Sequence, residues 1–230
     1  MLSVNLLVIA TGKYDRFLPR LLESTNEYFC RDYDVRIHVW SDGMIPAIPR
    51  VQPHYLPHEA WPHSSAHRWC AILSEQETLL QADYTFHMDA DTLFVAPVDS
   101  DIFGELVAII HPGFIDLAPE HFPYERRPES RACIPLGEGR RYYHSTPAGG
   151  ASHLILTAWT DMNQAMLDDE SRGIIAYASD ESYWNRYLID HPPTLELSPD
   201  YCCTPTTRDS RWWATRRITH VAKNAAELQI

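Results

Sequence analysis

The sequence has 230 residues, of which 31 are acidic and 19 basic, so its formal net charge is −12. This excess of negative charge disfavours nucleic acid and anionic membranes as partners, because the field of the protein repels polyanions. At first sight it also disfavours a phosphorylated substrate. With 45% hydrophobic residues the chain can bury one sizeable core, and we expect residues 1–230 to form a single domain.

The chain has no recognisable targeting segment. Its N-terminal apolar stretch, residues 4–10, is too short for a membrane span and has no basic residues before it, so we expect neither a membrane span nor a signal peptide. The five cysteines are odd in number and show no Cys-x-x-Cys spacing, which disfavours a disulfide framework and a four-thiolate zinc site. We therefore expect a reduced, cytoplasmic protein.

Strand-like and helix-like stretches alternate in the N-terminal half. Residues 4–10 form an apolar stretch interrupted by Asn5, and residues 34–40 alternate apolar and polar side chains; both patterns predict strands. This half is further expected to hold a helix over 16–30, a loop over 42–63, a helix over 67–81 and a strand over 84–88. The alternation predicts an α/β fold with a mainly parallel sheet, in which ligands bind beyond the carboxyl ends of the strands.

The second half is less regular. Residues 106–110 are typical of a strand, and a turn-rich segment follows over 111–143. Two helices are predicted, over 152–169 with Ser152 as a possible cap, and over 180–190 with Ser179 as N-cap. The last segment, 207–223, is locally basic.

Two aspartates interrupt an apolar run at Asp89-Ala90-Asp91. If the strand continues, period-two geometry places both carboxylates on the same face. Two convergent carboxylates are hard oxygen ligands suited to Mg²⁺ or Mn²⁺, and such an ion can neutralise charge on a departing diphosphate. The alternative is an ordinary aspartate-rich turn, since Asp-x-Asp is common by chance. The preceding apolar run favours the functional reading, because unpaired carboxylates are costly inside a strand.

Acidic residues also begin the predicted helix at Ser179-Asp180-Glu181-Ser182. Carboxylates at a helix N-terminus are stabilised by the helix dipole, which needs no function. The functional alternative is that Glu181 faces a cleft as a nucleophile or as a stabiliser of an oxocarbenium-like centre.

Four histidines, His54, His58, His63 and His67, lie in a segment rich in proline. The spacing from His58 to His63 is one residue too long for a His-Glu-x-x-His metalloprotease motif, and Pro62 would break the required helix. We therefore expect a loop with solvent-facing histidines. The sequence also lacks a dinucleotide fingerprint, a P-loop and a Gly-x-Ser-x-Gly elbow.

Several segments in series resemble glycosyltransferase family 6. This family comprises the vertebrate ABO blood-group transferases, the α-1,3-galactosyltransferases and short soluble bacterial and phage relatives. The segments that carry the resemblance are His111-Pro112-Gly113-Phe114, Pro123-Tyr124-Glu125-Arg126-Arg127-Pro128, Ile134-Pro135, Glu138-Gly139, Tyr142-Tyr143, Gly149-Gly150, Asp180-Glu181-Ser182, Asn185-x-Tyr187-Leu188, Pro199-x-Tyr201 and Lys223-Asn224.

The resemblance implies a GT-A fold, a Rossmann-like single domain that uses a nucleotide sugar. It implies retaining transfer of galactose or N-acetylgalactosamine from a UDP-sugar to a hydroxyl of a glycan acceptor, with an α-1,3 linkage. Asp89 and Asp91 match the family's Asp-x-Asp, which binds Mn²⁺ (or Mg²⁺) and the UDP diphosphate. Many bacterial relatives carry asparagines there and work without metal, so this chain resembles the metal-dependent branch. Glu181 matches the proposed nucleophile, and Asp180 its donor-binding neighbour.

Further substrate contacts follow from the same resemblance. Arg68 matches an arginine that contacts the metal-site aspartate and the donor, and Lys223 matches a lysine that contacts the diphosphate. We also expect the basic run from Arg208 to Lys223 to close over the diphosphate from the C-terminus. His111 and Pro123 fall at acceptor positions. The remaining positions expected to bind the nucleotide or the sugar are Ile9, Ala10, Thr11, Tyr14, Ala90, His144, Ser145 and Thr146.

The chain departs from the family at three places. His144-Ser145-Thr146 replaces the donor-selecting tripeptide, and its size favours UDP-galactose over the N-acetylated sugar. Ala178 stands where relatives have an acceptor-contacting tryptophan, and Thr204 where they have an acidic acceptor contact. These changes leave the acceptor open, with two alternatives to transfer: a UDP-sugar hydrolase and a non-catalytic sugar-binding module. The oligomeric state is also open.

Overall fold

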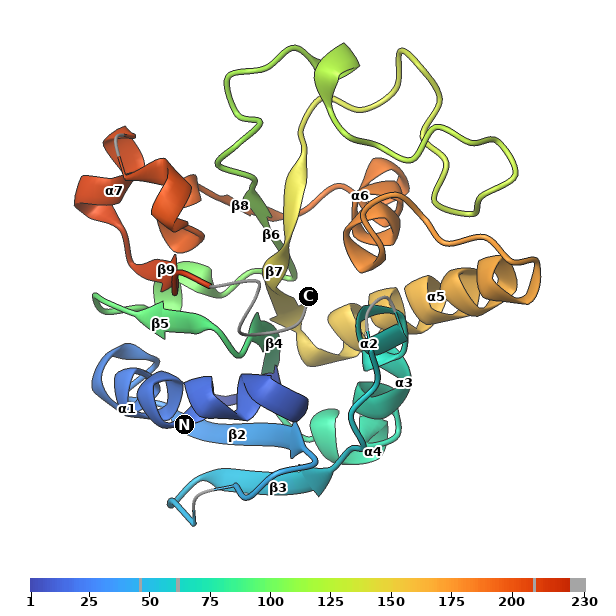
Figure 1. The fold of residues 1–230 in the computed structure, drawn as a ribbon. Coiled ribbons are helices and arrows are strands. Elements are labelled where there is room, and N and C mark those ends of the chain that lie inside the picture. Colours follow the sequence, from blue (N-terminus) through green and yellow to red (C-terminus); the bar gives the residue numbers. More distant parts are fainter. Residues whose placement is uncertain (46, 61–62, 209, 224–230) are drawn as a thin grey trace.

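A seven-stranded mixed sheet organises the molecule (Figure 1), and the computed structural model describes residues 1–45, 47–60, 63–208 and 210–223. Its strand order is β3-β2-β1-β4-β7-β6-β8, and within this sheet only β7 runs against the others. The strands are β1 (Ser3–Ile9), β2 (Asp34–Ser41), β3 (Val51–Tyr55), β4 (Tyr84–Asp89), β6 (Leu106–Ile110), β7 (Tyr143–Ala151) and β8 (Leu195–Leu197). The expected α/β fold with a mainly parallel sheet is confirmed.

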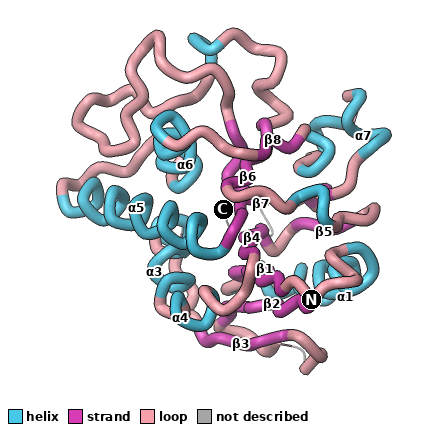
Figure 2. The backbone as a smooth tube through the Cα atoms, turned by 180° about the vertical axis from the view of Figure 1, so that it is seen from behind, coloured by secondary structure: helices cyan, strands magenta, loops and turns pink. Residues whose placement is uncertain are grey.

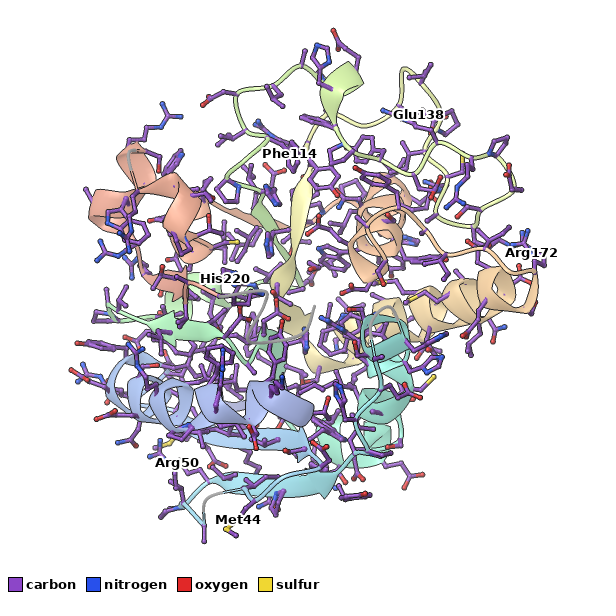
Figure 3. All side chains as sticks on the ribbon, viewed as in Figure 1. Met44, Arg50, Phe114, Glu138, Arg172 and His220 are labelled. Carbon is purple, nitrogen blue, oxygen red and sulfur yellow. The ribbon has the colours of Figure 1, made fainter. Side chains whose placement is uncertain are left out.

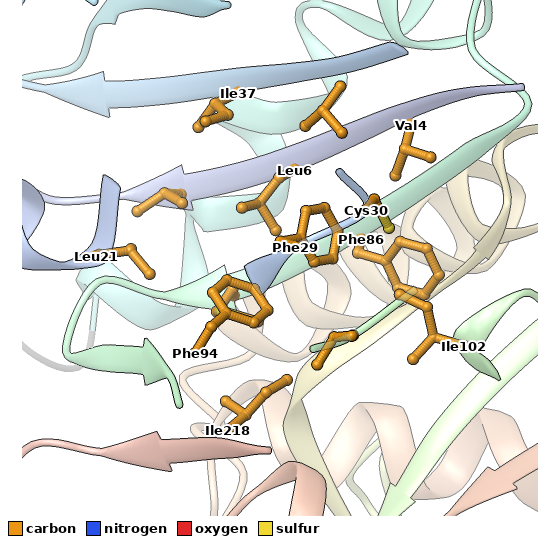
Figure 4. Packing of buried hydrophobic residues seen from close by; sticks show 14 of the residues in the cluster. Val4, Leu6, Leu21, Phe29, Cys30, Ile37, Phe86, Phe94, Ile102 and Ile218 are labelled. Carbon is orange, nitrogen blue, oxygen red and sulfur yellow. The ribbon is translucent and has the colours of Figure 1, made fainter. Parts of the chain in front are cut away.

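Alternate side chains of β1 enter two different cores. Val4, Leu6 and Val8 belong to the core that includes the apolar side of α1 (Leu18–Tyr28), as Figure 4 shows for Val4 and Leu6. Leu7 belongs to the opposite core. Burial of each such side chain contributes about 1.5–3 kcal/mol, so a one-residue slip of β1 would be strongly disfavoured.

The opposite core is covered by helices from three parts of the chain. Figure 2 shows α3, α4 and α5 on one side of the sheet and α1 on the other. Trp69 and Trp159 stack at 4.8 Å between ring centroids and join α3 to α5. The helices of this layer are α3 (Arg68–Leu73), α4 (Gln76–Leu79), α5 (Ser152–Ser171) and α6 (Asp180–Asp190). In the part of the chain that is described, no helix is both long and apolar enough to cross a membrane.

A two-stranded antiparallel sheet joins distant parts of the chain. β5 (Thr92–Phe94) pairs with β9 (Ile218–His220), so that Thr92 lies opposite His220. A short helix, α7 (Arg211–Thr215), precedes β9. This pairing brings the residues after 217 next to the chain that follows Asp91.

A long excursion connects β6 to β7. Residues 111–142 extend beyond the edge of the sheet, in green to yellow in Figure 1, and contain the short 3-10 helix η3 (Pro119–His121). Four side chains give the excursion its own small core: Phe122, Tyr124, Ile134 and Tyr142. The turn-rich character predicted for this segment is confirmed.

Several predicted elements differ from the structure. The helix expected over 16–30 begins with a 3-10 turn, η1 (Gly12–Phe17), and the one expected over 67–81 is interrupted at Ser74, whose hydroxyl donates to the Ala71 carbonyl at 2.7 Å. The loop expected over 42–63 contains β3, an edge strand that tolerates Pro53. It ends where α2 (His63–Ala66) begins. Residues 46, 61 and 62 of that segment, and Asn224, lie outside the described residues.

Neither predicted helix cap forms a side-chain capping bond. Ser152 is the first residue of α5, and its hydroxyl is hydrogen-bonded to the Thr85 hydroxyl at 2.8 Å. Ser179 does occupy the N-cap position of α6, but its φ is 48° and its side chain makes no cap bond. Strand β7 was not predicted, because its paired glycines are typical of turns. Gly149 is required there, since a Cβ would lie 2.2 Å from Cδ1 of Phe86 on β4.

Candidate active site

The predicted functional residues meet at one edge of the sheet. Ile9 at the end of β1 pairs with Asp89 at the end of β4, and the antiparallel β7 begins at the same edge. The carboxyl ends of the parallel strands are where α/β sheets bind ligands. Chain segments separated by more than 100 residues therefore contribute to one site.

Asp89 is held by two groups. Its Oδ1 lies 3.4 Å from Nη1 of Arg68, and its Oδ2 accepts a hydrogen bond of 2.8 Å from the Thr146 hydroxyl. Burial alone would raise the pKa of Asp89, but Arg68 is the strongest of the opposing groups and the pKa lies below its ordinary value. Asp89 is therefore ionised at neutral pH.

Arg68 also binds Asp180, the first residue of α6. The distance from Nη1 of Arg68 to Oδ2 of Asp180 is 3.2 Å. Burial raises the pKa of Asp180 to about 6, and Arg68 only partly offsets that effect because Asp89 is nearby. One guanidinium thus bridges the end of β4 and the start of α6.

Asp91 is almost fully buried, with 1% of its side chain exposed, and it faces cations from the C-terminal segment. Its Oδ2 lies 2.8 Å from Nζ of Lys223 and 3.9 Å from Nδ1 of His220. Burial raises the pKa of Asp91, but His220 and Lys223 outweigh it and the pKa is lowered. The Lys223 ammonium also lies 5.6 Å from the ring centroid of Tyr14.

The two aspartates and His220 form a cluster suited to a divalent cation. Ligand atoms of Asp89, Asp91 and His220 lie within 4.8 Å of one another. Figure 3 labels His220 on β9. The two aspartates converge although the strand does not continue through them, because β4 ends at Asp89 and β5 begins at Thr92. Two ionised carboxylate groups fit a hard cation such as Mn²⁺ or Mg²⁺.

Glu181 lies in the first turn of α6 and both of its oxygens are held. The Tyr142 hydroxyl donates to Oε1 at 2.7 Å, and the Ser145 backbone N–H donates to Oε2 at 2.9 Å. Asn185, one turn later, is hydrogen-bonded to the backbone N–H and C=O of Tyr143, which fixes α6 against β7. The carboxylate therefore has a defined orientation.

The pKa values of two histidines beside Glu181 are shifted in opposite directions. The rings of His111 and His144 stack at 4.9 Å between centroids. Burial lowers the pKa of His111 to about 3. Burial also opposes the charging of His144, but Cys202 is the main group that reverses this effect, with help from Glu181, and the pKa of His144 rises to about 9. At neutral pH one ring is neutral and the other carries a positive charge.

Some predicted contacts are fully enclosed by protein. Ala10, Ala90 and Thr146 are at most 1% exposed, so they shape the site from beneath rather than offer a surface. Thr11 is hydrogen-bonded to His58 at 3.2 Å between Oγ1 and Nδ1. Pro123 lies in the excursion over 111–142.

The basic segment near the C-terminus does not close over the site as a whole. The guanidinium groups of Arg208 and Arg216 lie over the ring of Trp213, and that of Arg211 lies over Trp212. Lys223 is the cation of this segment that the structure places on Asp91. The expectation that the whole run covers a diphosphate is therefore wrong for these arginines.

The four histidines of the proline-rich segment all have polar partners. His54 is hydrogen-bonded to His38 and His58 to Thr11, whereas His63 and His67 both contact a carboxylate on α5. The expected solvent-facing loop is wrong for His54, which is stacked on Trp40 at 4.5 Å between centroids.

Comparisons with known proteins identify the family. The sequence model of glycosyltransferase family 6 matches residues 1–229. This chain belongs to glycosyltransferase family 6. It is 33% identical over 211 residues to globoside α-1,3-N-acetylgalactosaminyltransferase 1 of Gallus gallus, covering 87% of this chain and 61% of that protein. It is 35% identical over 209 residues to histo-blood group ABO system transferase 1 of Rattus norvegicus, covering 86% and 60%. The chain thus spans about three fifths of these relatives' length.

Two contacts in this family 6 chain were not assigned from the sequence. Tyr142 belonged to a quoted motif but received no role, although its hydroxyl binds Glu181. His220 lies in a short strand that was not predicted, and only its pairing with Thr92 brings it to Asp91. Ile218 and His220 are two residues apart, the spacing of side chains on one face of a strand. Three residues are too few, however, to distinguish a strand from a turn by this spacing.

Proposed function

We propose that this chain is a retaining, Mn²⁺-dependent glycosyltransferase with one transferase domain over residues 1–230, of the short bacterial or phage type. It transfers galactose, or N-acetylgalactosamine, from a UDP-sugar to a hydroxyl of a glycan acceptor and forms an α-1,3 linkage. The printed names of the relatives support this class of activity. All five cysteines are free, which supports a reducing compartment such as the cytoplasm.

The observation that carries the proposal is that the candidate metal ligands, Asp89 and Asp91, and the candidate catalytic residue, Glu181, lie at one edge of the sheet. Asp89 and Asp91 would hold the divalent cation. Such a cation would supply positive charge that neutralises the negative charge of the leaving diphosphate. Glu181 is bound to Ser145, the neighbour of the Thr146 that binds Asp89, and both of its oxygens are oriented. From there it can stabilise or attack an electron-poor anomeric carbon. A covalent intermediate and a reaction on one face are both compatible with this role.

The protein's cations complete the donor site. Arg68 holds Asp89 and Asp180 in fixed positions, so Asp180 can orient the sugar. Lys223 balances Asp91 and lies beside Tyr14, where it can pair with a diphosphate oxygen. These local charges explain how an acidic chain can accept an anionic donor.

The donor sugar is chosen by the start of β7. Thr146 is larger than the glycine or alanine that leaves room for an N-acetyl group, and its hydroxyl is fixed on Asp89. His144 resembles the residue of the galactose-using members. A steric difference of this kind is worth about 1–3 kcal/mol, so we expect UDP-galactose to be preferred by about 10–200-fold.

A donor screen tests the proposed function. UDP release should be measured with Mn²⁺ from UDP-galactose, UDP-N-acetylgalactosamine, UDP-glucose and UDP-N-acetylglucosamine, with and without a panel of galactosides. We expect fastest release from UDP-galactose with an acceptor present. Equal release without any acceptor would favour a hydrolase. Glycan binding with no dependence on UDP or Mn²⁺ would favour a sugar-binding module.

The rate should depend on the charge of Asp180. With its pKa at about 6, this carboxyl is neutral in more acidic solution and gains the charge that pairs with Arg68 as the pH rises. We expect kcat/KM for the donor to increase through about pH 6. Asp180→Asn should be slower and should lack this step. An unchanged step in that variant would assign the titration to another group.

A further inference from the structure

A second histidine–carboxylate cluster lies away from the aspartate pair. His63 and His67 are one helical turn apart, and the His67 N–H donates to the His63 carbonyl at 2.8 Å. Both rings face Glu170 on α5: Nδ1 of His63 lies 3.3 Å from Oε1, and Nε2 of His67 lies 3.2 Å from both carboxylate oxygens. The ligand atoms of the three residues all lie within 4.8 Å of one another.

These spacings match a tetrahedral metal site. Zinc–nitrogen and zinc–oxygen bonds of about 2.0–2.1 Å put neighbouring ligand atoms about 3.3 Å apart. The two histidine–carboxylate distances, 3.3 Å and 3.2 Å, are already close to this value, so only the separation between the imidazole nitrogens would have to adjust. Imidazole and carboxylate groups together are ligands for Zn²⁺ and related transition metals.

A fourth residue binds the ring nitrogen of His67 that faces away from the proposed metal, as a carboxylate commonly does in such sites. Oε2 of Glu59 lies 2.8 Å from Nδ1 of His67, on the side of the ring opposite Glu170. A carboxylate that accepts a hydrogen bond from the Nδ1–H group keeps the proton on that nitrogen. Nε2 is then free of a proton and directed at the metal, as in carboxylate–histidine–zinc arrangements. The two glutamates also balance the charge of a divalent ion. His63 and Glu170 line a cavity of about 220 Å³, which has room for a water molecule as a further ligand.

We propose that His63, His67 and Glu170 bind a transition-metal ion of the Zn²⁺ class, with Glu59 orienting His67. The site is separate from the aspartate pair and does not depend on the proposed transfer reaction. The ion ties α2 and His67 to α5. Because Arg68 follows His67 directly and contacts Asp89 and Asp180, the bound ion also holds the start of α3 against the active site.

Cobalt provides a direct probe, because Co²⁺ in a tetrahedral site has much stronger visible absorption than octahedral Co²⁺. The titration should use the purified full chain carrying Asp89→Asn and Asp91→Asn, so that the aspartate pair does not compete. We expect one Co²⁺ per chain with a tetrahedral spectrum, displaced by Zn²⁺. Hydrogen exchange at the His67 amide should slow when the ion is added.

Variants of the cluster decide between a metal site and a hydrogen-bonded cluster. His63→Ala and Glu170→Gln, added to the same background, should weaken Co²⁺ binding at least about 100-fold, since even the loss of an outer partner costs about 10–100-fold. His153→Ala, at an exposed histidine on α5, is the matched control and should bind as the parent does. His63 is 53% exposed at its side chain, so its removal should leave the fold intact. The proposal would be overturned if the chain carrying Asp89→Asn and Asp91→Asn bound no Co²⁺, or if both cluster variants bound Co²⁺ as tightly as that chain does.

Discussion

Replacing Glu181 by glutamine should lower the rate of sugar transfer by at least about 10³-fold while the affinity for UDP with Mn²⁺ stays nearly unchanged. The amide keeps the shape of the side chain and can accept the Ser145 N–H while donating to the Tyr142 oxygen. It lacks the negative charge that the proposed role at the anomeric carbon requires. Steady-state rates and calorimetric titration with UDP and Mn²⁺ measure the two effects separately.

The chain contains a matched control for this substitution. Glu196 on β8 also accepts a hydrogen bond from a tyrosine hydroxyl, that of Tyr143, but it is not among the predicted site residues. Glu196→Gln should retain close to the parent rate. A parent-like rate in Glu181→Gln would remove the catalytic role assigned to that residue, whereas equal losses in both variants would point to a structural effect.

Asp91→Asn should reduce transfer by at least about 100-fold, because the metal-dependent stabilisation of the leaving diphosphate amounts to several kcal/mol. The substitution removes the charge that faces Lys223 and His220 while preserving side-chain volume. Excess EDTA should have a similar effect on the parent protein, reversed by added Mn²⁺. Electron paramagnetic resonance of Mn²⁺ should detect weakened binding in the variant without relying on activity.

Asp190→Asn serves as the control for the aspartate substitution. Asp190 pairs with Arg186 at 2.7 Å on the exposed end of α6, so its loss removes an ion pair without touching the sheet edge. Its activity should match that of the parent. Full activity of the parent protein in EDTA would contradict the metal dependence.

Local patterns were sufficient to predict the elements that frame the site. The apolar stretch over 4–10 and the strand at 84–88 correspond to β1 and β4, because strands buried on both faces are rich in apolar side chains. The helix at 180–190 was predicted with the bounds of α6, since Pro192 and the acidic first turn mark its ends. Because β1 and β4 are parallel neighbours, their carboxyl ends lie at the same edge of the sheet, which places residue 9 beside Asp89.

Long-range pairing could not be predicted from the same patterns. β7 contains Pro147 and two glycines, residues that are typical of a turn. It forms a strand because β4 and β6 pair with it on either side. β5 and β9 have three residues each, too few to show a period. The position of His220 beside Asp91 depends on that pairing, so this part of the site is visible only in three dimensions.

The excursion over residues 111–142 leaves and re-enters the sheet at one place, because Ile110 and Tyr143 are paired on neighbouring strands. Lengthening such a loop costs little, about 0.6 kcal/mol for each doubling. The excursion has its own small core, and the Tyr177 backbone N–H donates a hydrogen bond to Glu125 within it. Insertions within this loop should therefore be tolerated away from its two ends, whereas changes at Tyr142 and His111 reach Glu181 and His144 directly.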